Sequence, residues 1–175
     1  MKQLVVISGK GGTGKTSLTG SLAALHGKQG AEKPVIVDCD VDAPNLEILL
    51  GGEEVGREGF FGPRLAGIDP SSPVDIGRLE DSCRFGAIFG RRVEPLKCVG
   101  CAACRLAAPE AVEMVERKSG EIIERSTRFG RFFFAELLPG QPGFGGVISA
   151  LRMKAEEAAL SGSDPLLLID GSPGL

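Results

Sequence analysis

The most informative stretch of this 175-residue chain is Gly9-Lys-Gly-Gly-Thr-Gly-Lys-Thr16. The run matches the Walker A pattern G-x-x-x-x-G-K-S/T in full. It lies between an apolar segment at residues 3–8, which predicts a short strand, and helical apolar spacing at residues 16–28. In such a place the backbone N–H groups of the loop and the positive end of the helix surround phosphate oxygens. The run therefore predicts a phosphate-binding loop.

The residues of this loop have distinct expected roles. Lys15 is expected to reach the β- and γ-phosphates of a nucleotide, and Thr16 to bind the accompanying Mg²⁺. Nucleotide binding is assigned to one continuous run, namely Gly11, Gly12, Thr13, Gly14, Lys15, Thr16 and Ser17. Lys10 is an additional lysine, and by itself it is compatible with a solvated charge.

Acidic residues follow two further apolar segments. Asp38-Cys-Asp-Val-Asp42 ends the strand predicted at residues 34–38, and Asp170 ends the apolar run at residues 166–169. Ligands of a doubly wound sheet bind at the carboxyl ends of its strands, and a Walker B acid occupies that place. We therefore expect a cation beside these carboxylates, and the alternative is a set of solvated loop acids.

The order of the apolar segments sets the fold class. Strands predicted at residues 3–8, 34–38 and 166–169 alternate with helices predicted at residues 16–28, 44–50 and 147–160. This alternation predicts an α/β fold with a doubly wound parallel sheet. Such sheets average about five or six strands. We therefore expect the sheet to be incomplete and the chain to be the N-terminal part of a longer protein.

Changes of composition divide the chain. Residues 1–52 and 139–175 are expected to form the domain that contains the phosphate loop, and an insert interrupts it. Residues 53–72 are rich in Gly, Pro and Ser without any period, so they predict a linker. Residues 73–138 contain the clustered cysteines and then antiparallel strands that are expected to turn at residues 118–120.

Three cysteines of the insert have a spacing typical of a metal centre. Cys98-Val-Gly-Cys-Ala-Ala-Cys104 resembles the bacterial ferredoxin run C-x2-C-x2-C-x3-C-P, with Ala108 in place of the last cysteine. In two-cluster ferredoxins that last cysteine ligates the other cluster, so the missing ligand should come from upstream, where Cys83 lies. One [4Fe-4S] cluster is thus expected on Cys83, Cys98, Cys101 and Cys104. A four-cysteine zinc site is the alternative.

The second cluster position of such a domain has no cysteine. Counting back from Cys83 with the same spacing gives Pro73, Ile76 and Leu79, and Ala108 completes the set. Random loss would leave two mixed sites, whereas here one ligand set is whole and the other is absent. The insert therefore resembles a bacterial ferredoxin-like α+β domain that is reduced to one cluster.

Three motifs, in order, resemble those of one enzyme family. GKGGTGKT, DCDVDAPN and LLLIDGSPG are similar to the nucleotide-site motifs of the MinD/ParA/Mrp deviant-Walker P-loop ATPases, the CobQ/CobB/MinD/ParA superfamily. The resemblance implies ATP hydrolysis in a homodimer that closes on ATP. It also implies that Lys10 reaches the nucleotide of the partner subunit and that Asp40 orients water. Asp38 and Asp170 would then support Mg²⁺ together with Thr16, and Lys10, Lys15 and Asp40 would be catalytic.

The combination resembles the MinD-type ATPases with ferredoxin domains that are found near Mrp proteins. It implies an ATPase that couples nucleotide state to electron transfer through its cluster, with a redox protein as partner. Two alternatives remain open. One is ATP-dependent assembly or delivery of a cluster to an iron-sulfur acceptor protein, and the other is a MinD-like positioning ATPase.

Composition excludes two classes of partner. Lys and Arg number 20 against 23 Asp and Glu, and this net charge of -3 leaves no basic field for nucleic acid. No apolar run approaches the roughly 18 residues of a membrane span. We expect a cytoplasmic protein whose five cysteines are reduced, which favours metal ligation over disulfides. Cys39 is expected to pack as a small apolar residue.

Overall fold

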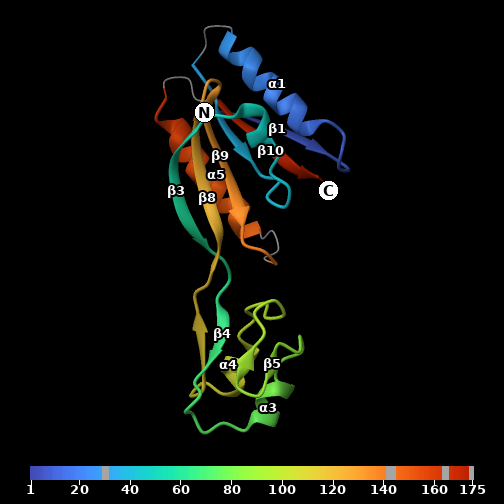
Figure 1. The fold of residues 1–175 in the computed structure, drawn as a ribbon, viewed down its shortest axis with the longest axis vertical. Coiled ribbons are helices and arrows are strands. Elements are labelled where there is room, and N and C mark those ends of the chain that lie inside the picture. The colour runs from blue at the N-terminus through green and yellow to red at the C-terminus, as the bar shows by residue number, and fades with distance from the viewer. Residues whose placement is uncertain (29–31, 141–144, 163–165, 174–175) are drawn as a thin grey trace. The chain divides into compact units, whose positions relative to one another are not determined.

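A computed structural model describes residues 1–28, 32–140, 145–162 and 166–173 of the chain (Figure 1). The chain divides into two compact units. Unit 1 consists of Met1–Phe60 and Gly120–Leu175, and unit 2 consists of Phe61–Ser119. An insert therefore interrupts the first unit, and its bounds differ from the expected 73–138.

Unit 1 is built on a six-stranded sheet in the order β1-β10-β2-β9-β8-β3. Its strands are β1 (Lys2–Ser8), β2 (Val35–Asp38), β3 (Glu53–Phe61), β8 (Lys118–Thr127), β9 (Gly130–Leu137) and β10 (Leu166–Pro173). β1, β10, β2 and β9 pair in parallel, and β8 pairs with β9 in antiparallel. The predicted α/β class with a mainly parallel central sheet is confirmed.

Two local predictions are wrong. The expected linker at residues 53–72 contains the edge strand β3 and a further strand at residues 65–68. β3 is largely exposed and polar, so it shows no apolar period. The β8–β9 turn lies at Arg128-Phe129, whereas residues 118–120 begin β8. The sheet therefore contains three strands, β3, β8 and β9, that the count of three predicted strands omits.

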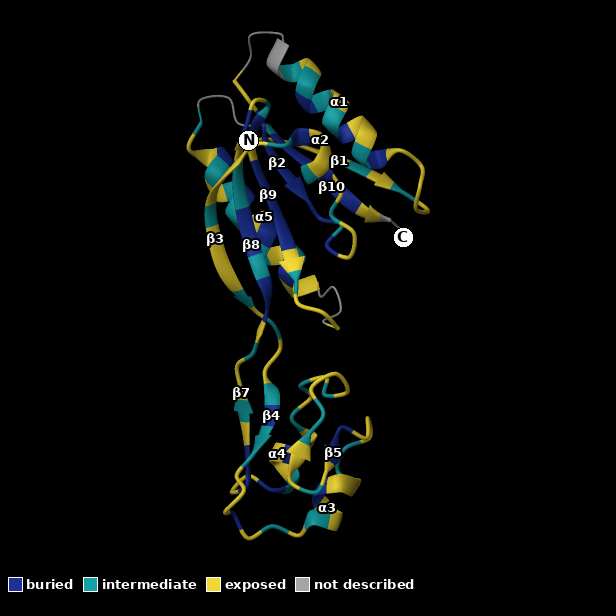
Figure 2. Ribbon diagram, viewed as in Figure 1, coloured by how far each residue is buried: buried dark blue, intermediate teal, exposed yellow. Residues whose placement is uncertain are grey.

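Helices cover both faces of this sheet. α1 (Lys15–Lys28) and α2 (Leu46–Leu50) pack on one face, and α5 (Gly145–Leu160) packs on the other. Along β2, Ile36 packs on the face covered by α1 and α2, whereas Val35 and Val37 pack on the face covered by α5. This alternation is the two-residue period of a strand. Figure 2 shows the buried residues along β2 and β9. Burial on both faces explains the continuous apolar runs of the central strands β2, β9 and β10, whereas β1 and β3 are largely exposed.

Phe132, Phe133 and Phe134 of β9 are all buried in the two cores of unit 1. The rings of Phe132 and Phe134 stack with centroids 5.1 Å apart. Among the residues that the structure describes, no helix is long and apolar enough to cross a membrane.

Unit 2 contains two β-α-β halves. The first is β4 (Leu65–Ile68), α3 (Ile76–Asp81) and β5 (Ile88–Phe89), and the second is β6 (Arg92–Val93), α4 (Ala103–Ala107) and β7 (Val112–Val115). β4 pairs in antiparallel with β7, and β5 pairs in antiparallel with β6. The first strand of each half thus pairs with the last strand of the other, so the topology has two-fold symmetry. Its small apolar core consists of Ala66, Leu79, Ile88, Cys104, Ala108, Ala111 and Val112.

Candidate nucleotide site and cysteine pocket

The phosphate loop connects the end of β1 to the start of α1. Gly12 and Gly14 have φ values of 74° and 87°, a conformation that glycine adopts without steric cost. Positive φ at alternate residues turns successive N–H groups toward one centre and forms an anion-binding concavity. The loop borders a pocket of about 460 Å³ that is lined by Gly11, Gly12, Thr13, Gly14, Lys15, Thr16, Ser17, Asp40, Asn45, Ile48 and Leu49.

Two buried carboxylates, Asp38 on β2 and Asp170 on β10, are not among the described residues that line this pocket. Asp38 and Asp170 are direct neighbours in the parallel register of β2 and β10. The Asp38 carboxylate accepts hydrogen bonds from the N–H groups of Asp40 (2.9 Å) and Leu46 (3.2 Å). Burial raises the pKa of Asp38 to about 7, and the negative charge of Asp170 acts in the same direction. A cation at this place would stabilise both charged forms.

Asp170 supplies the test of whether a magnesium ion fits. Its Oδ1 lies 3.2 Å from the Thr19 hydroxyl, and its buried Oδ2 has no hydrogen-bond partner among the described residues. An unsatisfied buried carboxylate oxygen is costly, and Mg²⁺ prefers oxygen ligands. Asp170, Asp38 and Thr16 could therefore support Mg²⁺, directly or through water.

The structure places the two expected lysines differently. Lys15 is 8% exposed at the start of α1 and faces the same pocket as Asp40. Burial raises the pKa of Asp40, and the positive charge of Lys15 opposes this shift. Lys10 is exposed and is not among the described residues that line the pocket. Its carbonyl accepts a hydrogen bond from the Ser8 hydroxyl at 2.8 Å.

Thr19 is a site residue that sequence reasoning missed. It is completely buried, and its hydroxyl lies 3.0 Å from the Lys15 carbonyl as well as near Asp170. Thr19 therefore connects α1 to the end of β10. Its position four residues after Lys15, on the same helix face, was the available signal. Asn45, Ile48 and Leu49 were also missed as pocket residues.

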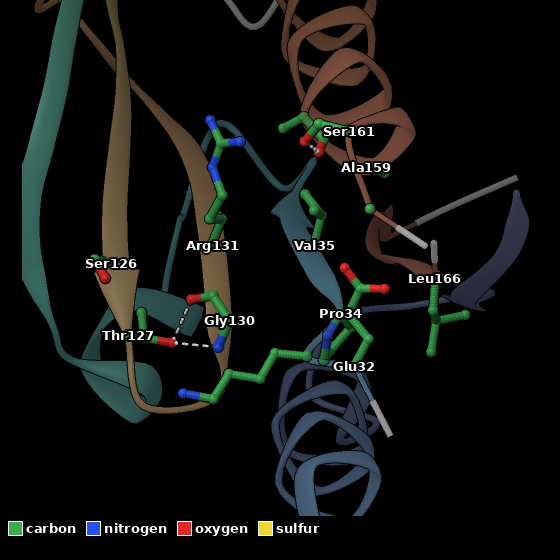
Figure 3. Close-up of a pocket in the computed structure, with 13 residues that line it drawn as sticks. Glu32, Pro34, Val35, Ser126, Thr127, Gly130, Arg131, Ala159, Ser161 and Leu166 are labelled. Atoms are coloured by element: carbon green, nitrogen blue, oxygen red, sulfur yellow. Dashed lines mark hydrogen bonds between the residues drawn. The ribbon is translucent and has the colours of Figure 1, made fainter. Parts of the chain in front are cut away.

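A second pocket of unit 1, of about 430 Å³, lies at the amino ends of β2 and β10 (Figure 3). Val35 and Leu166, the first residues of these strands, line it. The Thr127 hydroxyl in its wall donates a hydrogen bond to the Gly130 carbonyl at 2.8 Å, so this donor already has a partner within the protein. Ligands of parallel sheets bind at the opposite, carboxyl ends, so this pocket is distinct from the nucleotide site.

All four cysteines of unit 2 line one pocket. Cys104 is buried, Cys83 and Cys98 are half-buried and Cys101 is exposed. The rest of the lining is mainly apolar and includes Ala66, Phe85, Ala87, Ile88, Val99, Ala102, Ala103 and Met114. Burial raises the pKa of Cys104, and the nearby Cys98 and Cys83 add to the shift. Four thiolates would therefore need a cationic centre between them.

The backbone of the cysteine loop resembles that of the phosphate loop. Gly100 and Ala102 have φ values of 71° and 61°, and Ala102 is the only non-glycine residue with positive φ in the described ranges. The N–H group of Ala87 donates to the Cys83 sulfur at 3.3 Å. Such N–H donors to sulfur tune iron-sulfur centres.

The four cysteine side chains line one pocket but do not form the geometry of a metal site. Across the part of the chain that the structure describes, no group of three or more His, Cys, Asp or Glu side chains is arranged to hold a metal ion. The structure thus brings the four predicted ligands to one pocket without forming a finished metal geometry. Cys39 belongs to unit 1, where it packs in the core with a pKa that burial raises to about 11. This confirms the expected packing role of Cys39.

Several known proteins are similar to this chain. An uncharacterized protein of Methanocaldococcus jannaschii is 33% identical over 174 residues, which are 99% of this chain and 60% of that protein. The septum site-determining protein MinD of Thermotoga maritima is 48% identical over 50 residues, 29% of this chain and 18% of MinD. An iron-sulfur cluster carrier protein of M. jannaschii is 40% identical over 63 residues, 34% of this chain and 21% of the carrier.

The chain spans less than two thirds of the length of each of these relatives. No solved structure matches it significantly. Residues 4–165 match the sequence profile of the CobQ/CobB/MinD/ParA nucleotide-binding domain. This match covers the phosphate loop, the acids after β2 and most of the sheet described above. The chain therefore belongs to the CobQ/CobB/MinD/ParA nucleotide-binding domain family.

Proposed function

We propose that this nucleotide-binding protein hydrolyses ATP and couples its nucleotide state to electron transfer through one [4Fe-4S] cluster in unit 2. The observation that carries the proposal is the cysteine pocket, because it collects the complete predicted ligand set within one small insert. The other unit supplies a phosphate loop with buried acids. Both halves of the proposed coupling thus have a defined place in the chain.

On the nucleotide side, each residue has a separate task. Lys15 contacts the β- and γ-phosphates, and Thr16, Asp38 and Asp170 support Mg²⁺. Asp40 lines the same pocket as Lys15 and orients the attacking water. Lys10 is exposed and therefore free to reach the nucleotide of a second subunit in a homodimer.

On the cluster side, Cys83, Cys98, Cys101 and Cys104 would hold the iron, and the group would supply one-electron transfer when bound. The two-fold topology of unit 2 supports its origin as a two-cluster domain. Leu79 and Ala108, which stand at expected ligand positions of the second cluster, are buried in the apolar core. Apolar packing at these two positions supports a domain with one centre.

Iron and sulfide should be quantified in anaerobically reconstituted protein, together with an EPR spectrum with and without ATP. About four irons per chain and a cubane spectrum are expected. Roughly eight irons, or stoichiometric zinc, would contradict the assignment.

Cluster delivery is the second candidate function. The similarity to an iron-sulfur cluster carrier protein favours it, as does the exposure of Cys101, which gives an acceptor access to one ligand. Transfer from the loaded protein to an apo-ferredoxin should be timed against a chelator. Transfer faster than chelation would favour delivery, whereas reversible reduction without transfer would favour electron transfer.

Coupling between the two units can be measured directly. β3 and β8, which are neighbours in the sheet of unit 1, are the strands at which the chain enters and leaves unit 2. A change in the ordering of segments that contact the γ-phosphate could therefore be transmitted through the sheet to unit 2. The midpoint potential should differ between ADP and a non-hydrolysable ATP analogue, with Asp40→Ala as a hydrolysis-impaired control. Identical potentials would show that the units act independently.

A further inference from the structure

Cations dominate the chain around the cysteine pocket. From Cys83 to Leu106 the sequence contains five cations, Arg84, Arg91, Arg92, Lys97 and Arg105, but only one acid, Glu94. The net charge of the whole chain is -3, so this segment differs in sign from the rest of the protein. A local field of this kind attracts acidic groups.

Large apolar side chains stand beside these cations. Phe85 and Val99 line the cysteine pocket and are 44% and 52% exposed, and Phe89, next to the pocket residue Ile88, is 58% exposed. The Arg84 guanidinium lies 5.8 Å from the centroid of the Phe85 ring, and the Lys97 ammonium lies 5.0 Å from that of Phe89. We call Arg84, Phe85, Phe89, Lys97 and Val99 the pocket rim.

Two acids close to the cysteine pocket in sequence accept hydrogen bonds from backbone N–H groups. The Glu94 carboxylate accepts a hydrogen bond from the N–H group of Leu96 at 3.3 Å, and that of Glu80 accepts one from Gly90. Asp81, at the end of α3, is the remaining acid close to the pocket in sequence. The cations of the rim, by contrast, contact only aromatic rings in the interactions described, which leaves their charges available to a partner.

We propose that the pocket rim is the docking surface for an acidic protein that exchanges electrons or a cluster with unit 2. The inference rests on the proposed function and names the chemistry of its partner. Aromatic and Arg side chains are the groups that dominate protein interfaces, and cations around an apolar centre steer an acidic partner to the cysteines. Nucleic acid is disfavoured because a phosphate backbone needs a longer basic track.

The test uses an acidic bacterial ferredoxin as probe and basic cytochrome c as the mismatched probe. Binding to the full chain should be measured by calorimetry at low and high salt, and iron should be determined on the same samples. The ferredoxin should bind and weaken with salt, and cytochrome c should not bind. The double variant Arg84→Glu/Lys97→Glu should weaken binding about tenfold, since rim charges act mainly through long-range attraction.

Arg128→Glu is the matched control. Arg128 is exposed in the β8–β9 turn of unit 1 and contacts Phe129 in the same way, at 4.5 Å. This variant should bind as the unaltered chain does. Equal weakening by Arg128→Glu, equal binding of both probes, or tighter binding of a single-stranded oligonucleotide would overturn the docking surface. If the reconstituted protein holds no iron and still binds the ferredoxin, the cluster is contradicted and the docking surface is supported.

Discussion

The phosphate loop and the cysteine loop share one backbone conformation. Each places positive φ at alternate residues, Gly12 and Gly14 in the first and Gly100 and Ala102 in the second. Both loops can therefore present N–H groups to an anionic group. They differ in what surrounds them, since the phosphate loop joins a strand of the main sheet to a 14-residue helix, whereas the cysteine loop precedes a five-residue helix.

This difference indicates which loop depends on its ligand. The phosphate loop is held by α1, and α1 is tied to β10 through Thr19 and Asp170. The cysteine loop belongs to a unit whose core contains seven residues, of which three are alanines and one is a cysteine. Units of this size bury too little apolar surface to be stable alone and usually need a metal or disulfides. We therefore expect cluster loss to loosen unit 2 and nucleotide loss to leave unit 1 folded.

The largest expected effect comes from removing a thiolate. Cys98→Ser should reduce bound iron from about four atoms per chain to almost none, since three ligands hold a cubane poorly. Hydrogen exchange in residues 61–119 should rise at the same time. Cys39→Ser is the control and should keep its iron. Loss of iron in Cys39→Ser with retention in Cys98→Ser would reverse the assignment of the cluster to unit 2.

Removing a lysine from the phosphate loop should have the next largest effect. Lys15→Ala should weaken ATP binding by about 100-fold or more, because a buried charge-assisted contact to the phosphates is lost. Lys10→Ala should change the affinity by less than about threefold and instead reduce hydrolysis and ATP-dependent dimerisation. Calorimetry and light scattering separate these outcomes. Equal loss of binding in both variants would show that Lys10 acts within its own subunit.

The substitution Gly100→Ala should destabilise unit 2 by about 2 kcal/mol. Its Cβ would collide with the Arg64 carbonyl and would also need a positive φ. Gly86→Ala, with φ of 57° and open space around its Cβ, is the matched control and should cost about 1 kcal/mol. Hydrogen exchange resolved to residues 61–119 measures both, since the chain has no Trp or Tyr for fluorescence. Equal costs would show that the loop moves away from Arg64.

The local part of each site could be predicted from the sequence. Strand, glycine loop and helix follow one another within residues 2–28, and the apolar runs that end at Asp38 and Asp170 become neighbouring strands. The cysteine spacing likewise predicted the four residues that line one pocket. In each case, a short motif or an apolar period determines the arrangement.

The parts that could not be predicted depend on pairing between distant segments. β3 is polar and mostly exposed, so its place in the sheet comes from hydrogen bonding with β8 and not from an apolar pattern. β8 and β9 follow the cysteines in sequence but belong to the sheet of unit 1. Thr19 was missed because its role depends on Asp170, which lies 151 residues away in the chain.

The smallest expected effect tests the alanine that stands where the phosphate loop has glycine. Ala102 has φ of 61° and ψ of 12°, which costs a Cβ-bearing residue roughly 1–2 kcal/mol. Ala102→Gly removes that cost, but the greater conformational freedom of glycine favours the unfolded state by about 0.5–1 kcal/mol. The stability of unit 2 should therefore rise by at most about 1.5 kcal/mol.

Because the backbone need not change, iron content should also stay the same in Ala102→Gly. Ala102→Val should instead destabilise unit 2 and lose iron, since a β-branched residue tolerates positive φ poorly. Hydrogen exchange and iron analysis of the two variants decide the matter. A clear loss of iron in Ala102→Gly would mean that the methyl group lining the pocket, and not the positive φ shared with the phosphate loop, shapes the cysteine site.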